Sequence, residues 1–132
     1  QQRFDQSIQV NWSGIKSNKN SKSLDKEKLI NEEGAKLLNS VNENSIIVSL
    51  DKEGIGWSTL KLKQKFDQWV ASSKEVSFLI GGPEGLSNKC LDSSHEIWSL
   101  SPLTFPHSIV PVIIIEQLYR VWTIEKNHPY HR

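Results

Sequence analysis

Residues 76–85 read VSFLIGGPEG, an apolar run that stops abruptly at two glycines and a proline. A short and nearly continuous apolar run bounded by turn residues is typical of a strand buried on both faces. Residues 45–50 (SIIVSL) have the same character, and residues 97–100 supply another candidate strand. Strands buried on both faces occur where helices cover a sheet from both sides, so these runs predict a mainly parallel sheet.

Working outward from these strands, three stretches carry apolar residues at helical spacing. They cover residues 24–40, the segment that follows Ser58, and residues 107–126. Ser58 is an N-cap residue type, and Trp57 and Leu62 are placed to form a hydrophobic staple around it. The residues that set the helical spacing are Ile30, Gly34, Leu37 and Leu38, then Leu62, Phe66, Trp69 and Val70, then Val112, Ile115, Leu118, Tyr119 and Trp122.

The alternation of strands and helices predicts an α/β fold with a mainly parallel sheet, in a single domain that spans all 132 residues. A further short strand is expected at the start of the chain, because Ile8, Val10 and Trp12 alternate with polar residues. Residues 13–23 (SGIKSNKNSKS) have no such period, and we expect a solvent-facing linker there.

The composition excludes several classes of protein. Hydrophobic residues make up 36% of the chain and charged residues 23%, which supports an ordinary core and excludes a fully disordered chain. The net charge of +1 gives no indication of nucleic-acid or membrane binding. Cys90 is the single cysteine, which excludes a disulfide scaffold and fits a reducing, cytoplasmic setting. We expect Cys90 to be a small buried hydrophobe and His95 a structural residue, with no metal site and no membrane span.

In sheets of this class, ligands bind beyond the C-terminal ends of the strands, so the segments after Leu50, Ile80 and Leu100 are candidates. The glycines around Pro83 permit close backbone approach to a ligand. Neither the dinucleotide-binding glycine pattern nor the P-loop lysine is present, and Glu84 favours a positively charged ligand over a phosphate. A purely structural tight turn is the alternative.

Residues 101–107 (SPLTFPH) contain two prolines, which fix φ and remove two N–H donors. A stiff loop of this kind can present its backbone polar groups to a flat heterocycle with little loss of entropy on binding. An ordinary rigid connection is the alternative.

The last residues of the chain gather polar groups of several kinds. They offer acid/base groups, a stacking ring and a guanidinium that suits phosphate. A polar surface tail without a function is the alternative. The groups are His128, Tyr130, His131 and Arg132, with Arg120 about two helical turns before them.

Four motifs in this order resemble one family signature. They are LIGGPEGLS at residues 79–87, WSLSPLTFPH at 98–107, EQLYR at 116–120 and HPYHR at 128–132. Together they resemble the bacterial large-subunit (23S) ribosomal RNA pseudouridine N3-methyltransferases, which are minimal members of the SPOUT class. The resemblance runs across almost the whole chain and is strongest from Val76 onward.

The resemblance implies a SPOUT-type α/β domain whose sheet is flanked by helices and whose C-terminal part forms a trefoil knot. It implies S-adenosylmethionine as the methyl donor, a homodimer with each active site near the subunit interface, and a pseudouridine N3 on the assembled ribosome as the target. Carried onto the matching positions, the cofactor-binding residues are Leu50, Gly81, Leu100, Ser101, Pro102, Leu103, Thr104 and Phe105.

The chemistry of this target calls for a base, because the pseudouridine N3 must lose its proton around the moment of methyl transfer. His131, or Tyr130 if its pKa is depressed, could take that proton. Arg120, His128 and Arg132 suit contacts with the RNA. The sequence alone does not rank these roles.

One departure from the family concerns the start of the chain. The family usually begins with a strand and most of a helix upstream of Gln1, and residues 1–4 look like the end of that helix. Because the chain starts without Met and contains none, we expect the natural N-terminus to lie upstream. No charged-then-apolar leader is visible.

Two other classes of function remain open at this point. The chain could be a non-catalytic RNA-binding or ribosome-assembly module of the same fold, or a small nucleotide-binding α/β regulator. The presence of both loops together with the complete tail favours the enzyme.

Overall fold

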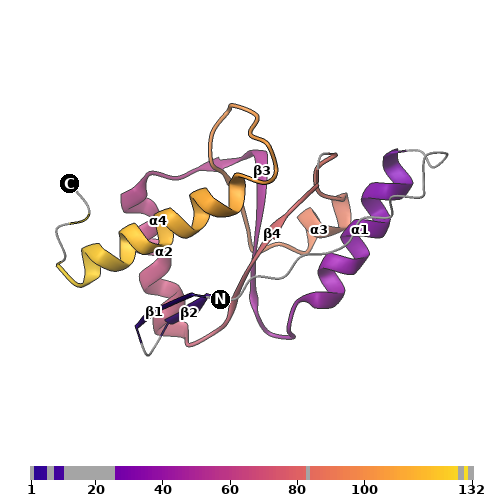
Figure 1. Ribbon diagram of the computed structural model, residues 1–132. Helices are drawn as coiled ribbons and strands as arrows, with labels where there is room; N and C mark the ends of the chain where they lie inside the picture. The colour runs from indigo at the N-terminus through magenta and orange to yellow at the C-terminus, as the bar shows by residue number, and fades with distance from the viewer. Residues whose placement is uncertain (1, 6–7, 11–25, 83, 128–129, 131–132) are drawn as a thin grey trace.

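A computed structural model describes residues 2–5, 8–10, 26–82, 84–127 and 130 (Figure 1). For residues 2–5 and 8–10 it describes the backbone. In chain order the elements are β1 (Gln2–Asp5), β2 (Ile8–Val10), α1 (Lys26–Ser40), β3 (Ile46–Gly56), α2 (Thr59–Ser72), β4 (Val76–Ile80), α3 (Asn88–Asp92), β5 (Glu96–Ser99) and α4 (Val110–Glu125).

The central feature is a three-stranded sheet in the order β4-β3-β5, and both strand pairs are parallel. β4 pairs with β3 in a continuous register from Ile46 opposite Val76 to Leu50 opposite Ile80. On the other side of β3, Leu50 lies opposite Trp98. The predicted mainly parallel sheet is therefore confirmed.

β3 is longer than the six residues expected from the sequence. Leu50 and Ile55 both have Trp98 as their partner in β5, so residues 51–54 form an excursion between them. An ideal Cβ on Gly54 would lie 2.6 Å from the carbonyl oxygen of Ile97, so only a glycine allows the strand to return this close to β5. The polar composition of the excursion resembles a loop, which is why the sequence did not predict this extension.

Helices α2 and α4 cover one face of the sheet, and α1 and α3 lie on its other side (Figure 1). The buried cluster under α2 and α4 contains two tryptophans, Trp69 of α2 and Trp98 of β5. Trp57 stacks on Trp98 with ring centroids 4.9 Å apart and planes inclined by 17°. Such offset stacking adds to the area that these rings bury. The buried members of the cluster are Val48, Leu62, Phe66, Trp69, Trp98, Ile114, Leu118 and Val121.

The second helix begins as predicted. The Ser58 side-chain oxygen accepts a hydrogen bond of 3.0 Å from the backbone N–H of Lys61, which is the N-cap geometry. Trp57 and Leu62 both belong to the core cluster, as the staple interpretation requires. Val70 is an exception, because its side chain is exposed and the buried face of α2 is formed by the other three predicted residues.

On the other side of the sheet, α1 packs against α3 through a glycine. An ideal Cβ on Gly34 would lie 2.9 Å from the Cβ of Ser87 and 3.3 Å from the sulfur of Cys90. Cys90 is fully buried, with its Sγ 3.5 Å from the carbonyl oxygen of Gly34, which confirms the prediction of a buried hydrophobe. α3 itself was not predicted, because five residues are too few to show a helical period.

The expectation for the first residues is wrong. Gln2–Asp5 is a strand, not the end of a helix, and it pairs antiparallel with β2 so that Gln2 lies opposite Val10. A strand this close along the chain supplies hydrogen-bond partners that an isolated helical turn would lack. β2 confirms the predicted strand at residues 8–10, whereas Trp12 and the linker at residues 13–23 lie outside the described residues.

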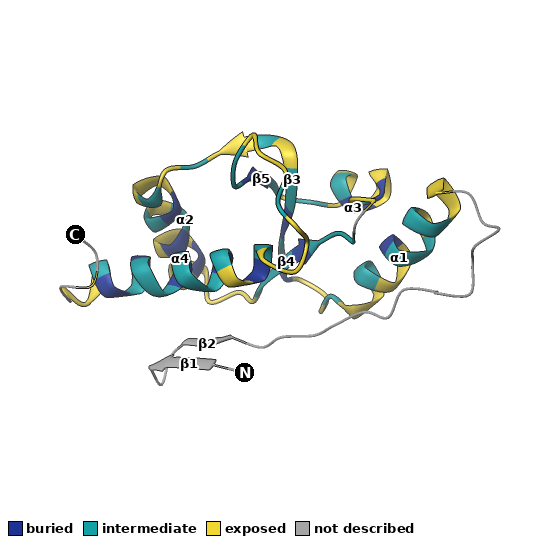
Figure 2. Ribbon diagram, turned by 45° about the horizontal axis from the view of Figure 1, so that its top comes forward, coloured by how far each residue is buried: buried dark blue, intermediate teal, exposed yellow. Residues whose placement is uncertain are grey.

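α4 starts three residues later than its predicted boundary at His107. Pro111 lies in its first turn, where a missing N–H costs nothing and the fixed φ suits the helix. Figure 2 shows buried, intermediate and exposed residues along α4. Of the buried ones, Pro111, Ile114, Leu118 and Val121 share one side of the helix, whereas Thr123 lies on the opposite side. In the part of the chain that the structure describes, no helix is both long enough and apolar enough to cross a membrane.

Candidate functional site

The segments after Ile80 and after Ser99 leave the sheet at neighbouring positions, on either side of Leu50 in β3. Leu50 of β3 lies opposite Ile80 of β4 on one side and Trp98 of β5 on the other. The chain after Ile80 and the chain after Ser99 therefore begin at the same edge of the sheet. The register therefore places Leu50 next to the ends of β4 and β5, although β3 itself continues to Gly56.

The segment after β4 folds into a tight glycine turn. The backbone N–H of Gly85 donates to the carbonyl oxygen of Gly82 over 3.0 Å, and the two residues also form an isolated antiparallel bridge. Gly85 has φ of +88°, a conformation that residues with a side chain rarely adopt. The segment is therefore a tight turn, as the structural alternative for these residues expected.

Gly81 is the residue over which this turn folds back. An ideal Cβ on Gly81 would lie 2.5 Å from the carbonyl carbon of Gly85 and 2.9 Å from the nitrogen of Leu86. Those atoms belong to the backbone and cannot rotate away, so any side chain at Gly81 must displace the turn. The sequence analysis attributed these glycines to close approach of a ligand, whereas a side chain at Gly81 would first contact the turn itself.

Two carboxylates lie near the glycine turn. An ideal Cβ on Gly82 would lie 3.0 Å from Oε2 of Glu33, so the Glu33 carboxylate from α1 reaches this glycine. Glu84 lies within the turn, and its Oε2 is 3.8 Å from the ammonium of Lys26. Because the Lys26 side chain is largely exposed, that ion pair adds little. The local charge favours a ligand with a positive group.

The loop after β5 is shaped by two serine hydroxyls. Ser99 donates its hydroxyl to the carbonyl oxygen of Ser101 over 3.1 Å, and the Ser101 hydroxyl accepts from the backbone N–H of Leu103 over 3.0 Å. Phe105 is half-buried, whereas Leu103 exposes 69% of its surface. The two hydroxyls fix the loop before α4 begins and leave an apolar side chain on its outside.

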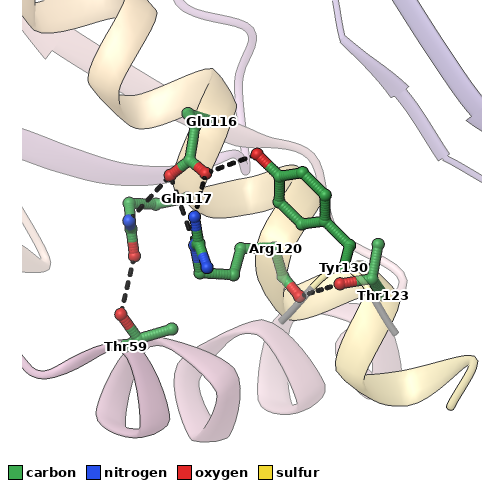
Figure 3. Close-up of polar contacts among 6 residues, drawn as sticks. All are labelled: Thr59, Glu116, Gln117, Arg120, Thr123 and Tyr130. Carbon is green, nitrogen blue, oxygen red and sulfur yellow. Dashed lines mark hydrogen bonds and ion pairs between the residues drawn. The ribbon is translucent and has the colours of Figure 1, made fainter. Parts of the chain in front are cut away.

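A second polar group of residues lies on α4, centred on Glu116 (Figure 3). Oε2 of Glu116 accepts a hydrogen bond of 2.8 Å from the hydroxyl of Tyr130 and one of 2.7 Å from Nη2 of Arg120. The guanidinium carbon of Arg120 also lies 4.9 Å from the centre of the Tyr130 ring. Tyr119 meets the same ring edge-to-face at 4.9 Å.

The other carboxylate oxygen connects this group to α2. Gln117 donates its amide to Oε1 of Glu116 over 2.8 Å, and the hydroxyl of Thr59 donates to the amide oxygen of Gln117 over 2.8 Å. Thr59 is the first residue of α2, so the chain of hydrogen bonds joins two helices (Figure 3). We name the group Glu116, Gln117, Arg120 and Tyr130 the tail network.

The hydrogen bonds of the tail network shift the pKa values of Glu116 and Tyr130 from their ordinary values in opposite directions. The hydrogen bond from Arg120 lowers the pKa of Glu116, against the opposing effect of its burial. The pKa of Tyr130 is raised, chiefly because its hydroxyl donates to the Glu116 carboxylate. Tyr130 could act as a base only if its pKa were depressed, and the raised pKa contradicts that condition. At neutral pH its hydroxyl is therefore a hydrogen-bond donor.

The structure separates the two groups of predicted site residues. The loop at residues 100–105 leads into the start of α4, and the helix then runs away from the strand ends (Figure 1). Glu116 is six residues along α4 from Val110, or about 9 Å along the helix axis at 1.5 Å per residue. Tyr130 and Arg120 therefore belong to the tail network and not to the strand ends. His128, His131 and Arg132 lie outside the described residues.

Glu116 was not identified from the sequence. Its spacing of four residues from Arg120 is that of a helical ion pair and could have been noted. His95 has the structural role that was predicted, since its Nδ1 accepts from the backbone N–H of Ile47 over 2.9 Å. Among the described residues, no group of His, Cys, Asp and Glu is arranged to hold a metal ion.

Comparison with known proteins gives two matches. A family model described as a predicted SPOUT methyltransferase matches residues 1–131. The ribosomal RNA large subunit methyltransferase H of Thioalkalivibrio sulfidiphilus (strain HL-EbGR7) is 41% identical over 123 residues, which cover 93% of this chain and 79% of that protein.

Proposed function

The chain belongs to the SPOUT methyltransferase family, and from that premise we propose how it methylates ribosomal RNA of the large subunit. The methyl donor is S-adenosylmethionine, and the target is N3 of a pseudouridine on the assembled ribosome. The enzyme acts in the cytoplasm, where ribosomes are found. The chain forms one SPOUT domain, and its C-terminal part forms the trefoil knot that the resemblance implies.

The residues at the strand ends fit S-adenosylmethionine. The glycine turn closes tightly at the end of β4, and Glu33 and Glu84 give the region the sign of charge that suits a sulfonium. The loop at residues 100–105 is fixed by Ser99 and Ser101 and can present its backbone to the adenine. The residues that would hold the cofactor are Leu50, Gly81, Leu100, Ser101, Pro102, Leu103, Thr104 and Phe105.

When bound, the cofactor supplies an electrophilic methyl group on a positively charged sulfur. The protein has two tasks, to position the pseudouridine N3 in line with that methyl group and to accept the proton that N3 loses. His131 is the proposed base, because the contact with Glu116 keeps Tyr130 protonated. Tyr130 then serves as a donor, and Arg120, His128 and Arg132 contact the RNA.

The observation that carries this proposal is the convergence of the glycine turn and the loop at residues 100–105 at one edge of the parallel sheet. Calorimetric titration with S-adenosylmethionine and S-adenosylhomocysteine should detect binding of both. Incubation with ribosomes from a strain that lacks the corresponding gene should transfer one radiolabelled methyl group to the large-subunit RNA. A non-catalytic RNA-binding module would bind neither cofactor, and that result would exclude the enzyme.

We also propose a homodimer, because α4 has apolar residues outside its buried stripe. Val112 exposes 62% of its surface and Ile109 45%, and the exposed Leu103 lies shortly before them. Val112 lies on a different face of α4 from Gln117, which is hydrogen-bonded to α2, so a second copy of the chain could cover it.

Replacing Val112 with aspartate should convert the dimer into a monomer, because the partner would have to bury an unpaired charge. Light scattering on the full-length protein at micromolar concentration should report twice the chain mass for the wild type and the chain mass for Val112→Asp. Val70 on α2 is similarly exposed, and Val70→Asp should remain dimeric. A monomeric wild type would contradict the proposed interface.

A further inference from the structure

Glu116 is engaged by three donors at once. Its carboxylate accepts hydrogen bonds from Gln117, Arg120 and Tyr130, and both of its oxygens are used. The Glu116 side chain is 34% exposed and that of Arg120 is 26% exposed, so the pair is better shielded from water than an ordinary surface ion pair. A carboxylate with both oxygens occupied by its own chain is poorly placed to act on a substrate.

The end of α4 explains how Tyr130 comes back to this carboxylate. The helix ends at Glu125, and Asn127 has φ of 57° in the left-handed region, which reverses the direction of the chain. The backbone N–H of Asn127 donates to the carbonyl oxygen of Ile124 over 3.2 Å and closes that turn. Tyr130 follows α4 in the chain, and the reversal lets its hydroxyl contact Glu116, which lies 14 positions earlier, on α4.

Two further contacts fix the orientation of the Tyr130 ring. Arg120 lies over one face of the ring at 4.9 Å, and the Tyr119 ring approaches it edge-to-face at 4.9 Å. The ring contacts fix the plane of the Tyr130 ring, and the hydrogen bond to Glu116 fixes the position of its hydroxyl.

We propose that Glu116 is a positioning residue, whose carboxylate holds the Arg120 guanidinium and the Tyr130 hydroxyl in one arrangement for contact with the RNA. This inference rests on the proposed function, because it assigns the tail to the RNA. Glu116 itself contacts neither the RNA nor the cofactor. Thr59 and Gln117 support it by tying the network to α2.

The contact can be tested without any assay of activity. The chain has two tyrosines, so a Tyr119→Phe background leaves Tyr130 as the one phenol whose ionisation ultraviolet absorbance reports. In this background Tyr130 should titrate at a higher pH than an ordinary tyrosine, and Glu116→Gln should return it toward the ordinary range. An unchanged titration would overturn the proposal, whatever the protein does to RNA.

The positioning role requires a kinetic measurement on ribosomes. Glu116→Gln should lower kcat for methyl transfer about tenfold or more and leave the dissociation constant for S-adenosylmethionine within twofold. The matched control is Glu125→Gln, which removes another carboxylate of α4 that pairs with Lys63 and lies outside the tail network. It should retain the kcat of the wild type. A shifted titration with an unchanged kcat would mean that the contact with Tyr130 exists but does not matter for methyl transfer, and it would overturn the positioning role.

A double-mutant comparison decides whether Glu116 acts through Tyr130. Tyr130→Phe removes the hydroxyl and keeps the ring contacts with Arg120 and Tyr119. If Glu116 acts as proposed, Glu116→Gln should lower kcat much less in the Tyr130→Phe background than in the wild type. Fully additive effects would overturn the proposal. A wild type without any methyl transfer would instead contradict the proposed function, and the positioning role would fall with it.

Discussion

Replacing Gly81 with valine is expected to lower the affinity for S-adenosylmethionine at least tenfold, or about 1.4 kcal/mol. The added Cβ would lie 2.5 Å from the carbonyl carbon of Gly85, so the glycine turn must move away from the strand end. A branched side chain enlarges that displacement. Calorimetric titration of the folded variant measures the effect, and an unchanged affinity would show that the cofactor does not use this turn.

A pair of alanine variants distinguishes the effect of displacing the glycine turn on cofactor affinity from the general effect of replacing a glycine near the sheet. Gly81→Ala adds only the clashing Cβ and should also weaken binding. Gly56→Ala adds the same atom where the nearest contact is the carbonyl oxygen of Ser99 at 3.9 Å, an ordinary separation. We expect Gly56→Ala to bind S-adenosylmethionine within twofold of the wild type. Equal losses in the two variants would indicate a nonspecific effect on the sheet.

Deleting residues 130–132 is expected to lower methyl transfer to ribosomes by about 10² or more, the usual scale for the loss of a positioned acid/base group. The deletion removes Tyr130 from Glu116 together with the proposed base His131 and with Arg132. Binding of S-adenosylmethionine should stay within a few-fold, because the glycine turn and the loop at residues 100–105 are untouched. Single-turnover assays and calorimetry measure the two effects separately.

Two substitutions then divide the contribution of the tail. His131→Ala should mainly slow the chemical step, whereas Arg132→Ala should mainly weaken binding to ribosomes and reduce its dependence on salt. Glu125→Gln, on the same helix but outside the tail network, serves as the control with full activity. Full activity after the deletion would show that the tail has no part in the reaction.

The sequence was most informative where burial leaves a simple pattern. Val76–Ile80 is apolar because helices cover both faces of the sheet, so its bounds were predicted to the residue. The Ser58 cap was visible for a similar reason, since a capping hydroxyl acts within three residues of its own position. Short-range chemistry of this kind can be identified from one chain.

The sequence was least informative where distant segments decide a conformation. The extension of β3 depends on a contact between Gly54 and Ile97, and nothing in its polar residues suggests a strand. The pairing of β1 with β2 likewise overrides the expected helix end.

In the candidate site too, some features were predictable from the sequence and others depend on contacts between distant segments. A rule about parallel sheets sufficed to bring Leu50, Gly81 and Leu100 together. The link between Glu116 and Tyr130 required the chain reversal at Asn127, and no local pattern at either residue predicts it. A depressed pKa for Tyr130 was a reasonable condition for a base, but the neighbouring carboxylate moves that pKa upward.

The parallel arrangement of β3 and β5 has a consequence for how the protein is made. Ile47 is hydrogen-bonded to His95, and 48 residues separate the two along the chain. At about 5–20 residues per second, translation delivers β5 roughly 2–10 s after its partner. Throughout that interval β3 has one edge without its final neighbour, because no hairpin can close the sheet early. Folding of this sheet is therefore expected to be slow and to follow synthesis, with β3 in need of protection from other unpaired strands.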